Sequence, residues 1–345
     1  MGEAYERCRG ELRASPRSWL VTGVAGFIGS HLLHELLSLG QRVCGLDSLV
    51  TGKRANLEAV RAAVGADAWS GFRFVEGDIC DLATCRDAAE SADVVLHQAA
   101  LGSVPRSIER PLDTHGANVT GSVHVFLAAA ERELRVVYAS SSSVYGDARQ
   151  LPQAEELIGA PLSPYAASKR IDEIYAQVYG RSHGLQATGL RYFNVVGSRQ
   201  DPEGPYAAVV PKWLAILADG GRPVIYGDGE TTRDFCPVAN VVQANLLAAT
   251  RGEASPRPVY NVALGGRTSL NDLYRILRDG CARRGVDCAD LAAEHADFRP
   301  GDLRDSEASI EAIRADLGYE PVVGLAEALD EVIASELAAR GLSPA

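Results

Sequence analysis

A tyrosine and a lysine four residues apart form the first pair in this sequence whose side chains could transfer a proton. Ser163 suits a helix N-cap and Pro164 the first helical turn, so a helix is predicted to begin here. Tyr165 and Lys169 then share one face, one turn apart. An ammonium beside a phenol lowers the tyrosine pKa from about 10, which makes a base usable near neutral pH. The same pair also fits an ordinary amphipathic helix, so the surrounding elements have to decide.

A glycine-rich turn near the N-terminus indicates a dinucleotide site. Residues 18–22 predict a buried strand, which runs into Gly23, Gly26 and Gly29 and then into a helical pattern over 30–39. In this strand–turn–helix arrangement the backbone can approach a pyrophosphate at the helix N-terminus. The sequence therefore predicts a binding loop for a dinucleotide cofactor.

An acidic residue at the end of the second predicted strand indicates which dinucleotide is bound. Asp47 follows the strand 42–46 and lies 18 residues after Gly29, near the spacing of a carboxylate that binds adenosine ribose. A carboxylate at this point repels a 2′-phosphate, so NAD is favoured over NADP. The alternative is a structural glycine turn followed by a solvated Asp47.

Strand and helix patterns alternate through the first half of the chain. This alternation predicts an α/β fold: a Rossmann-type, doubly wound parallel sheet with helices on both faces. Ligands in such sheets bind beyond the carboxyl ends of the strands, where Gly23, Asp47, Asp78, Gln98 and the serine run 140–143 all lie. The further predicted strands cover 72–76, 93–97, 134–139, 187–192 and 223–226, and the predicted helices 3–14, 82–90, 111–131, 164–182, 209–218, 238–249 and 268–284.

Composition narrows the class of protein. The 345 residues are 46% hydrophobic and 23% charged, as in globular proteins, and the net charge of −11 argues against nucleic-acid or anionic-membrane partners. No apolar run is long enough to span a bilayer, and the N-terminal residues show no signal-peptide core. The seven cysteines lack metal-ligand spacing, so no metal site is predicted and we expect reduced thiols in a cytoplasmic protein.

Three motifs in this order resemble the extended short-chain dehydrogenase/reductase family. They are the glycine pattern over 23–29, the Ser-Ser-Ser-Ser-Val-Tyr-Gly run at 140–146, and the Tyr165/Lys169 pair. Within that family the chain is similar to nucleotide-sugar 4-epimerases over about residues 19–319, in particular to bacterial UDP-N-acetylglucosamine 4-epimerases. The other segments that carry this likeness are 97–107, 191–195 and 199–202.

The resemblance implies a reaction in two half-steps. Tyr165 takes the proton of the sugar 4-hydroxyl with help from Ser141, while hydride passes from C4 to the nicotinamide of NAD. Lys169 stabilises the phenolate and holds the nicotinamide ribose. The 4-keto sugar then turns about its diphosphate link, and hydride returns to the opposite face. Because there is no net redox change, we expect NAD to stay tightly bound.

The resemblance also assigns residues to two ligands. Arg233 and Arg299 are expected to hold a UDP diphosphate and Asp302 the uridine ribose, while the small Ser306 and Ala208 leave room for an N-acetyl group. The residues expected to contact NAD are Gly23, Gly26, Phe27, Ile28, Gly29, Asp47, Thr51, Gly52, Asp78, Ile79, Gln98, Ala99, Ala100, Asn118, Tyr165, Lys169 and Phe193. Those expected to contact the UDP-sugar are Gly102, Ser103, Ser141, Ser142, Ser143, Tyr165, Asn194, Ala208, Val209, Val224, Tyr226, Arg233, Arg299, Asp302 and Ser306.

The chain is predicted to divide into two domains. Residues 1–194 form the NAD-binding Rossmann domain, to which 238–264 return. Residues 195–237 and 265–345 form a smaller C-terminal α/β domain that binds the UDP-sugar. The expected partners are this small-molecule substrate and, by analogy with the family, a second copy of the chain: helices 111–131 and 164–182 would pair across a homodimer as a four-helix bundle.

The residues just before Val144 distinguish between related reactions. Sugar dehydratases that resemble this chain carry Asp-Glu there and decarboxylases Glu, because work at C5 or C6 needs an additional acid. Here the positions are Ser142 and Ser143, so C4 epimerisation is predicted. A UDP-uronic acid 4-epimerase remains an alternative, although Asn194 favours amino sugars, and Asp305, where relatives tend to have His, leaves the sugar preference open. A non-enzymatic NAD-binding protein is disfavoured because the Ser/Tyr/Lys set is complete.

Overall fold

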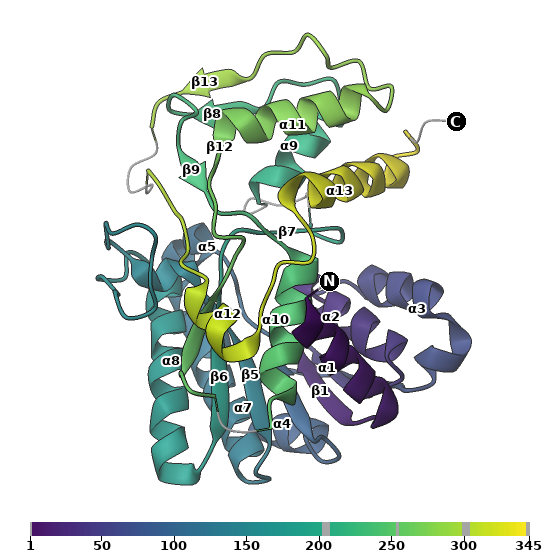
Figure 1. The fold of residues 1–345 in the computed structure, drawn as a ribbon, viewed down its shortest axis with the longest axis vertical. Coiled ribbons are helices and arrows are strands. Elements are labelled where there is room, and N and C mark those ends of the chain that lie inside the picture. The colour runs from purple at the N-terminus through teal and green to yellow at the C-terminus, as the bar shows by residue number, and fades with distance from the viewer. Residues whose placement is uncertain (1, 202–207, 253–254, 299–303, 343–345) are drawn as a thin grey trace.

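The centre of the molecule is a seven-stranded, fully parallel sheet with the order β11-β6-β5-β4-β1-β2-β3 (Figure 1). The computed structural model describes residues 2–201, 208–252, 255–298 and 304–342. The strand order reverses between β1 and β4, which opens a crevice at the carboxyl ends of these strands. This arrangement confirms the predicted doubly wound sheet. Its strands are β1 (Ser18–Thr22), β2 (Arg42–Asp47), β3 (Phe72–Glu76), β4 (Val94–His97), β5 (Arg135–Ser141), β6 (Gln186–Tyr192) and β11 (Val259–Val262).

Helices cover both faces of the sheet, so its central strands are apolar on both sides. In β1, Trp19 and Val21 pack into the core on one face, while Leu20 packs into the core on the other. On the first face lie α1 (Glu3–Ala14), α2 (Phe27–Ser38), α3 (Arg54–Trp69), α10 (Val238–Thr250) and α12 (Glu311–Leu317). On the second lie α4 (Leu82–Ala88), α7 (Gly121–Ala130) and α8 (Pro164–His183).

The predicted helix over 111–131 is interrupted in the structure. It consists of α6 (Pro111–His115), one π-helical turn at Gly116–Thr120, and α7. The turn directs Asn118 inward, where its side chain accepts a hydrogen bond from Leu101 N at 2.7 Å and donates one to Ser168 Oγ at 3.0 Å. A π-helical turn of this kind is common at functional sites, and the apolar pattern gives no sign of it because that pattern continues through the turn.

A smaller α/β unit lies beyond the carboxyl ends of the sheet strands (Figure 1). Its helices pack around a separate apolar core that includes Trp213, Leu277 and Leu329. Two-residue strand pairs connect it to the larger unit: β7 (Val195–Val196) with β10 (Cys236–Pro237), and β9 (Thr232–Arg233) with β12 (Thr268–Ser269). The other elements of the smaller unit are α9 (Val209–Ala218), α11 (Leu270–Ala282), α13 (Leu325–Ala339), β8 (Val224–Tyr226) and β13 (Glu294–Ala296).

The division between the two units differs from the predicted one at α12. The predicted C-terminal domain includes this helix, yet α12 packs against β11 and α10, and Ile313 and Tyr319 belong to the core of the large sheet. Tyr319 Oη also donates to Ala263 O at 2.9 Å, which ties this segment to the end of β11. Within the described ranges, no helix is both long and apolar enough to cross a membrane.

Candidate active site

Helix α8 begins as the sequence predicts and brings the two candidate catalytic side chains to one cleft. Ser163 Oγ accepts a hydrogen bond from Ala166 N at 3.1 Å, and Pro164 occupies the first turn. Tyr165 and Lys169 follow one turn apart, and both line the same cleft. The chain leaves β5 at the carboxyl end of that strand, and the connection to α8 stays at this edge of the sheet. The helix therefore begins there.

The ammonium of Lys169 is held by two acceptors, one on β5 and one on α8. Lys169 is 3% exposed, and its Nζ donates to Ala139 O at 3.0 Å and to Asp172 Oδ2 at 3.1 Å. Ala139 belongs to β5 and Asp172 to α8, so the lysine joins the strand to the helix. Sequence reasoning identified the lysine but not these two partners.

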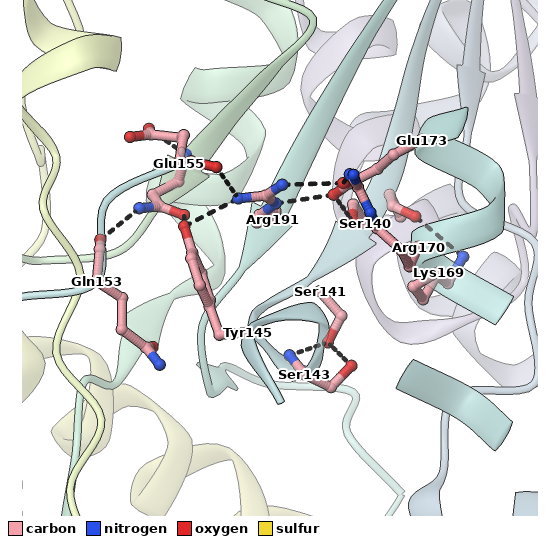
Figure 2. A network of polar contacts seen from close by, with 12 residues as sticks. Ser140, Ser141, Ser143, Tyr145, Gln153, Glu155, Lys169, Arg170, Glu173 and Arg191 are labelled. Atoms are coloured by element: carbon pink, nitrogen blue, oxygen red, sulfur yellow. Dashed lines mark hydrogen bonds and ion pairs between the residues drawn. The ribbon is translucent and has the colours of Figure 1, made fainter. Parts of the chain in front are cut away.

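The serine run at the end of β5 divides between the interior and the cleft. Successive residues of a strand point to opposite sides, so Ser140 turns inward and donates to Glu173 Oε1 at 2.7 Å. Ser141 lines the cleft, and its Oγ accepts from Ser143 N at 3.2 Å and lies 3.0 Å from Ser143 Oγ (Figure 2). Ser140 also lines the cleft, but its hydroxyl is occupied by Glu173, so Ser141 is the serine of β5 whose hydroxyl is placed to meet a ligand in the cleft that Tyr165 lines.

A buried ion pair holds β6 against α8. Arg191 donates from Nε and Nη2 to the two carboxylate oxygens of Glu173, at 2.8 and 2.9 Å. Figure 2 shows this arginine between Glu173 on one side and Tyr145 and Glu155 on the other; its Nη1 donates to Tyr145 Oη at 3.1 Å and to Glu155 O at 2.9 Å. Burial raises the pKa of Glu173, but the hydrogen bonds and charge of Arg191 outweigh it and leave that pKa below its usual range.

The glycine turn forms a cradle that fits a dinucleotide. Gly23 has φ 69°, and a Cβ there would come within 2.7 Å of Ala99 N, while a Cβ on Gly29 would overlap the Gly23 carbonyl. Asp47 at the end of β2 accepts hydrogen bonds from Ala25 N at 2.9 Å and Leu49 N at 2.8 Å, which aim its carboxylate along the cradle. These residues suit a pyrophosphate on the backbone and a ribose on the carboxylate.

One cleft of about 1570 Å³ runs from this cradle to the smaller unit, and its size exceeds that of an ordinary single-ligand pocket. It brings together 23 of the predicted site residues: Gly23, Gly26, Phe27, Ile28, Gly29, Asp47, Thr51, Asp78, Ile79, Gln98, Ala99, Ala100, Gly102, Ser141, Ser142, Tyr165, Lys169, Asn194, Ala208, Val209, Val224, Tyr226 and Arg233.

Six predicted residues lie beside the cleft rather than in its lining. Gly52 backs the Asp47 carboxylate, Asn118 and Ser143 support neighbouring residues, and Phe193 is buried 6.0 Å from the Tyr145 ring. The remaining two are Ser103, which caps α5 (Val104–Glu109), and Ser306, which is buried and donates from its N–H to Thr232 O at 3.2 Å. Two more predicted residues, Arg299 and Asp302, lie outside the described part of the chain.

Lys212 also lines the cleft, although sequence reasoning did not single it out. It is the one charged residue in α9, whose sequence is otherwise apolar. A single charged residue in an otherwise apolar helix is therefore the feature of the sequence that could have indicated Lys212 as a cleft residue. In the ranges that the structure describes, no cluster of three His, Cys, Asp or Glu side chains is arranged to hold a metal ion.

Comparison with known proteins decides the family. Residues 19–263 match the model of the NAD dependent epimerase/dehydratase family. This chain belongs to that family. The match covers the glycine cradle, Asp47, the serine run and the Tyr165/Lys169 pair, which confirms the resemblance seen in the sequence and identifies NAD as the cofactor.

Three relatives illustrate the range of activities within this family. The UDP-glucose 4-epimerase of Mycolicibacterium smegmatis is 36% identical over 91% of this chain and 96% of the relative. The dTDP-glucose 4,6-dehydratase of Streptomyces griseus is 34% identical over 91% and 92%. The structure of the UDP-N-acetylglucosamine 4-epimerase from Methanobrevibacter ruminantium M1, in complex with UDP-N-acetylmuramic acid, has 35% identity and a TM-score of 0.86 over 94% of this chain and 99% of the other. The chain is thus a member of the NAD-dependent nucleotide-sugar 4-epimerase family.

Proposed function

We propose that this protein interconverts the C4 epimers of a UDP-hexose, with UDP-N-acetylglucosamine and UDP-N-acetylgalactosamine as its substrate pair. The observation that carries the proposal is the composition of the cleft at the end of β5. Ser141, Tyr165 and Lys169 line it together, and the position beside Ser141 is Ser142 rather than an acid. A dehydratase needs a further acid or base near C5 and C6 of the sugar, and the β5 end supplies only hydroxyls.

Each residue has a distinct part in the proposed reaction. NAD, when bound, supplies oxidation and re-reduction at C4 of the sugar. Tyr165 accepts the proton of the 4-hydroxyl and later returns it, and Ser141 orients that hydroxyl toward the tyrosine. Lys169 stabilises the phenolate by its charge, which acts strongly because the ammonium is withdrawn from water. In the smaller unit, Arg233 lines the cleft where a diphosphate would extend.

The choice of an N-acetylated sugar is supported by the small residues around the expected sugar site and by one structural relative. Ser142, Asn194 and Ala208 line the cleft, and none of them is bulky. The similar structure from Methanobrevibacter ruminantium M1 is itself a UDP-N-acetylglucosamine 4-epimerase. Ser306, in contrast, lies outside the lining, so its part in setting pocket size stays a prediction.

A panel of nucleotide sugars tests the proposed function. The purified protein is incubated separately with UDP-glucose, UDP-N-acetylglucosamine, UDP-glucuronate, UDP-N-acetylglucosaminuronate and dTDP-glucose, and the products are resolved by chromatography. We expect UDP-N-acetylgalactosamine to form with the highest kcat/KM. Turnover of a uronate alone would assign the uronic acid 4-epimerase activity instead. A 4-keto-6-deoxy product from dTDP-glucose would overturn epimerisation altogether.

The bound cofactor gives a second prediction. Because the proposed reaction regenerates its oxidant, the protein has no need to release NAD, and we expect denatured, freshly purified protein to yield NAD plus NADH near one per chain. Enzymatic cycling assays specific for NAD and for NADP measure this directly. Recovery of NADP, or turnover that consumes added reductant in stoichiometric amount, would contradict the proposal.

The predicted homodimer stays a prediction, and one surface is compatible with it. Ile174, Tyr175 and Val178 lie on one side of α8, and all three are exposed. Exposed apolar side chains gathered on one helix face are typical of contact surfaces between subunits. The same helix carries Tyr165 and Lys169 on its buried side, so such pairing would support the catalytic helix from behind.

A further inference from the structure

A second buried carboxylate lies beside the catalytic lysine, and sequence reasoning assigned it no part. Asp172 is on α8, three residues after Lys169, and it is 2% exposed. We propose that Asp172 is a positioning residue, which fixes and charges the Lys169 ammonium for proton transfer by Tyr165. The inference rests on the proposed function only in taking Tyr165 and Lys169 as the reacting pair.

Two hydrogen bonds fix the orientation of the Lys169 ammonium. An ammonium has three N–H donors and no acceptor. Two of them are directed to Ala139 O at 3.0 Å and to Asp172 Oδ2 at 3.1 Å. The third is then available to the cleft that Lys169 lines, where Tyr165 also lies. Ala139 O alone could not fix this orientation, because the ammonium rotates freely about a single acceptor.

The charge of Asp172 acts in two ways. A buried ammonium without a counter-ion tends to lose its proton, since burial penalises the charged form. Asp172 supplies that counter-ion, 3.1 Å from the ammonium of Lys169. The same negative charge offsets part of the positive potential that the ammonium exerts at Tyr165. The carboxylate thus sets how strongly the lysine favours the phenolate.

The other ionisable groups near this pair keep their charge state through the working pH range. On β4, burial and then the charge of Lys169 lower the pKa of His97 to about 3, so it is neutral. On β5, burial raises the pKa of Tyr138 well above its usual value. Next to Asp172, Glu173 is ionised and paired with Arg191 of β6.

Among these groups, Asp172 is the one whose pKa lies closest to neutral pH. Burial raises its pKa to about 6, against the opposing effects of the charge and hydrogen bond of Lys169. At neutral pH and above, the carboxylate is therefore charged and the ion pair is complete. Below about pH 6 it gains a proton and no longer offsets the ammonium.

Asp172→Asn tests the proposal, because it removes the charge and keeps the size. With that negative charge gone, the positive potential around Tyr165 and Lys169 rises, so both groups lose their protons at lower pH. We expect both limbs of the kcat–pH profile to move to lower pH by on the order of half a unit or more. A merely structural role would reduce the amplitude of the profile without moving it.

A substrate-free measurement separates this inference from the proposed function. The ultraviolet absorbance titration of Tyr165 is obtained as the difference between each protein and the same protein carrying Tyr165→Phe. We expect the Tyr165 titration to move to lower pH in Asp172→Asn. In the matched control Asp113→Asn it should not move, because this exposed cleft carboxylate does not contact Lys169. An unmoved titration in Asp172→Asn would overturn the proposal, and a moved titration in a protein with no epimerase activity would overturn only the proposed function.

A double variant covers the case in which Asp172→Asn does not fold. Asp172→Asn/Lys169→Met removes both buried charges, so no ion is left without its partner. We expect it to resist urea better than Asp172→Asn does, because the two substitutions are coupled through the ion pair. Losses in Asp172→Asn and Lys169→Met that simply add in the double variant would show that Lys169 does not depend on Asp172, which would overturn the proposal. Where Asp172→Asn is unfolded, a double variant that is unfolded as well would overturn it in the same way.

Discussion

Tyr165→Phe is expected to lose about 10²- to 10⁴-fold in kcat while it retains NAD and UDP-sugar binding. The phenylalanine ring fills the same space in the cleft, so the ligands keep their contacts. The hydroxyl that accepts the proton from the sugar is gone, and Ser141, the hydroxyl beside it, has no base to receive that proton. Lys169 can stabilise a phenolate but cannot replace one.

Steady-state kinetics with the best nucleotide sugar, together with ligand binding by calorimetry, check this expectation. Tyr175→Phe is the matched control, because Tyr175 lies on the same helix but is exposed and outside the cleft. The control should keep wild-type kcat. If Tyr165→Phe keeps near-normal turnover, or if it loses ligand binding to the same degree as turnover, Tyr165 is not the base.

Arg191→Met is expected to destabilise the fold by about 3–5 kcal/mol. Arg191 is 1% exposed and Glu173 0% exposed, and the arginine donates to both oxygens of this carboxylate. Removing the guanidinium leaves a buried carboxylate with less compensation and also leaves Tyr145 Oη without one of its partners. Because Arg191 lies on β6 and Glu173 on α8, the loss also weakens the packing of the helix that carries Tyr165 and Lys169.

Urea unfolding followed by circular dichroism measures this change. The matched control is Arg170→Met, since Arg170 donates to the same carboxylate at 2.8 Å but is 34% exposed. Partly solvated pairs contribute about 0–1 kcal/mol, so the control should be nearly as stable as wild type. Equal effects of the two substitutions would show that burial of the Arg191–Glu173 pair adds nothing to the stability of this fold.

Local chemistry explains why much of this site could be predicted from the sequence. The glycine turn, Asp47 and the start of α8 depend on residues that are neighbours in the chain: positive φ at Gly23, a cap at Ser163, a proline in the first turn. The alternation of strand and helix then specifies a parallel sheet, and such sheets bind ligands at the carboxyl ends of their strands. The family and the fold followed from these features and were confirmed by the structure and its relatives, while the role of the Tyr165/Lys169 pair stays a prediction.

Packing between distant segments decided the rest. The family resemblance points to Ser141, but only the placement of β5 in the sheet shows that the Ser140 hydroxyl is occupied by Glu173. The ion pair of Arg191 with Glu173 joins residues 18 apart on different elements, and no local pattern indicates it. The pairing of Lys169 with Asp172 fits helical spacing, yet only the burial of that helix face makes the pair strong enough to matter.

The sequence by itself therefore determined the glycine loop, the placement of Tyr165 and Lys169 one turn apart on a helix, and the parallel sheet. Each of these rests on backbone preferences and on spacing along the chain. Tertiary structure alone decided the return of α12 to the large sheet, the exclusion of Ser306 from the cleft lining and the partners of each buried charge. These outcomes depend on which faces of the helices and strands pack against one another. Burial at those contacts then determines how strongly each buried charge interacts with its partners.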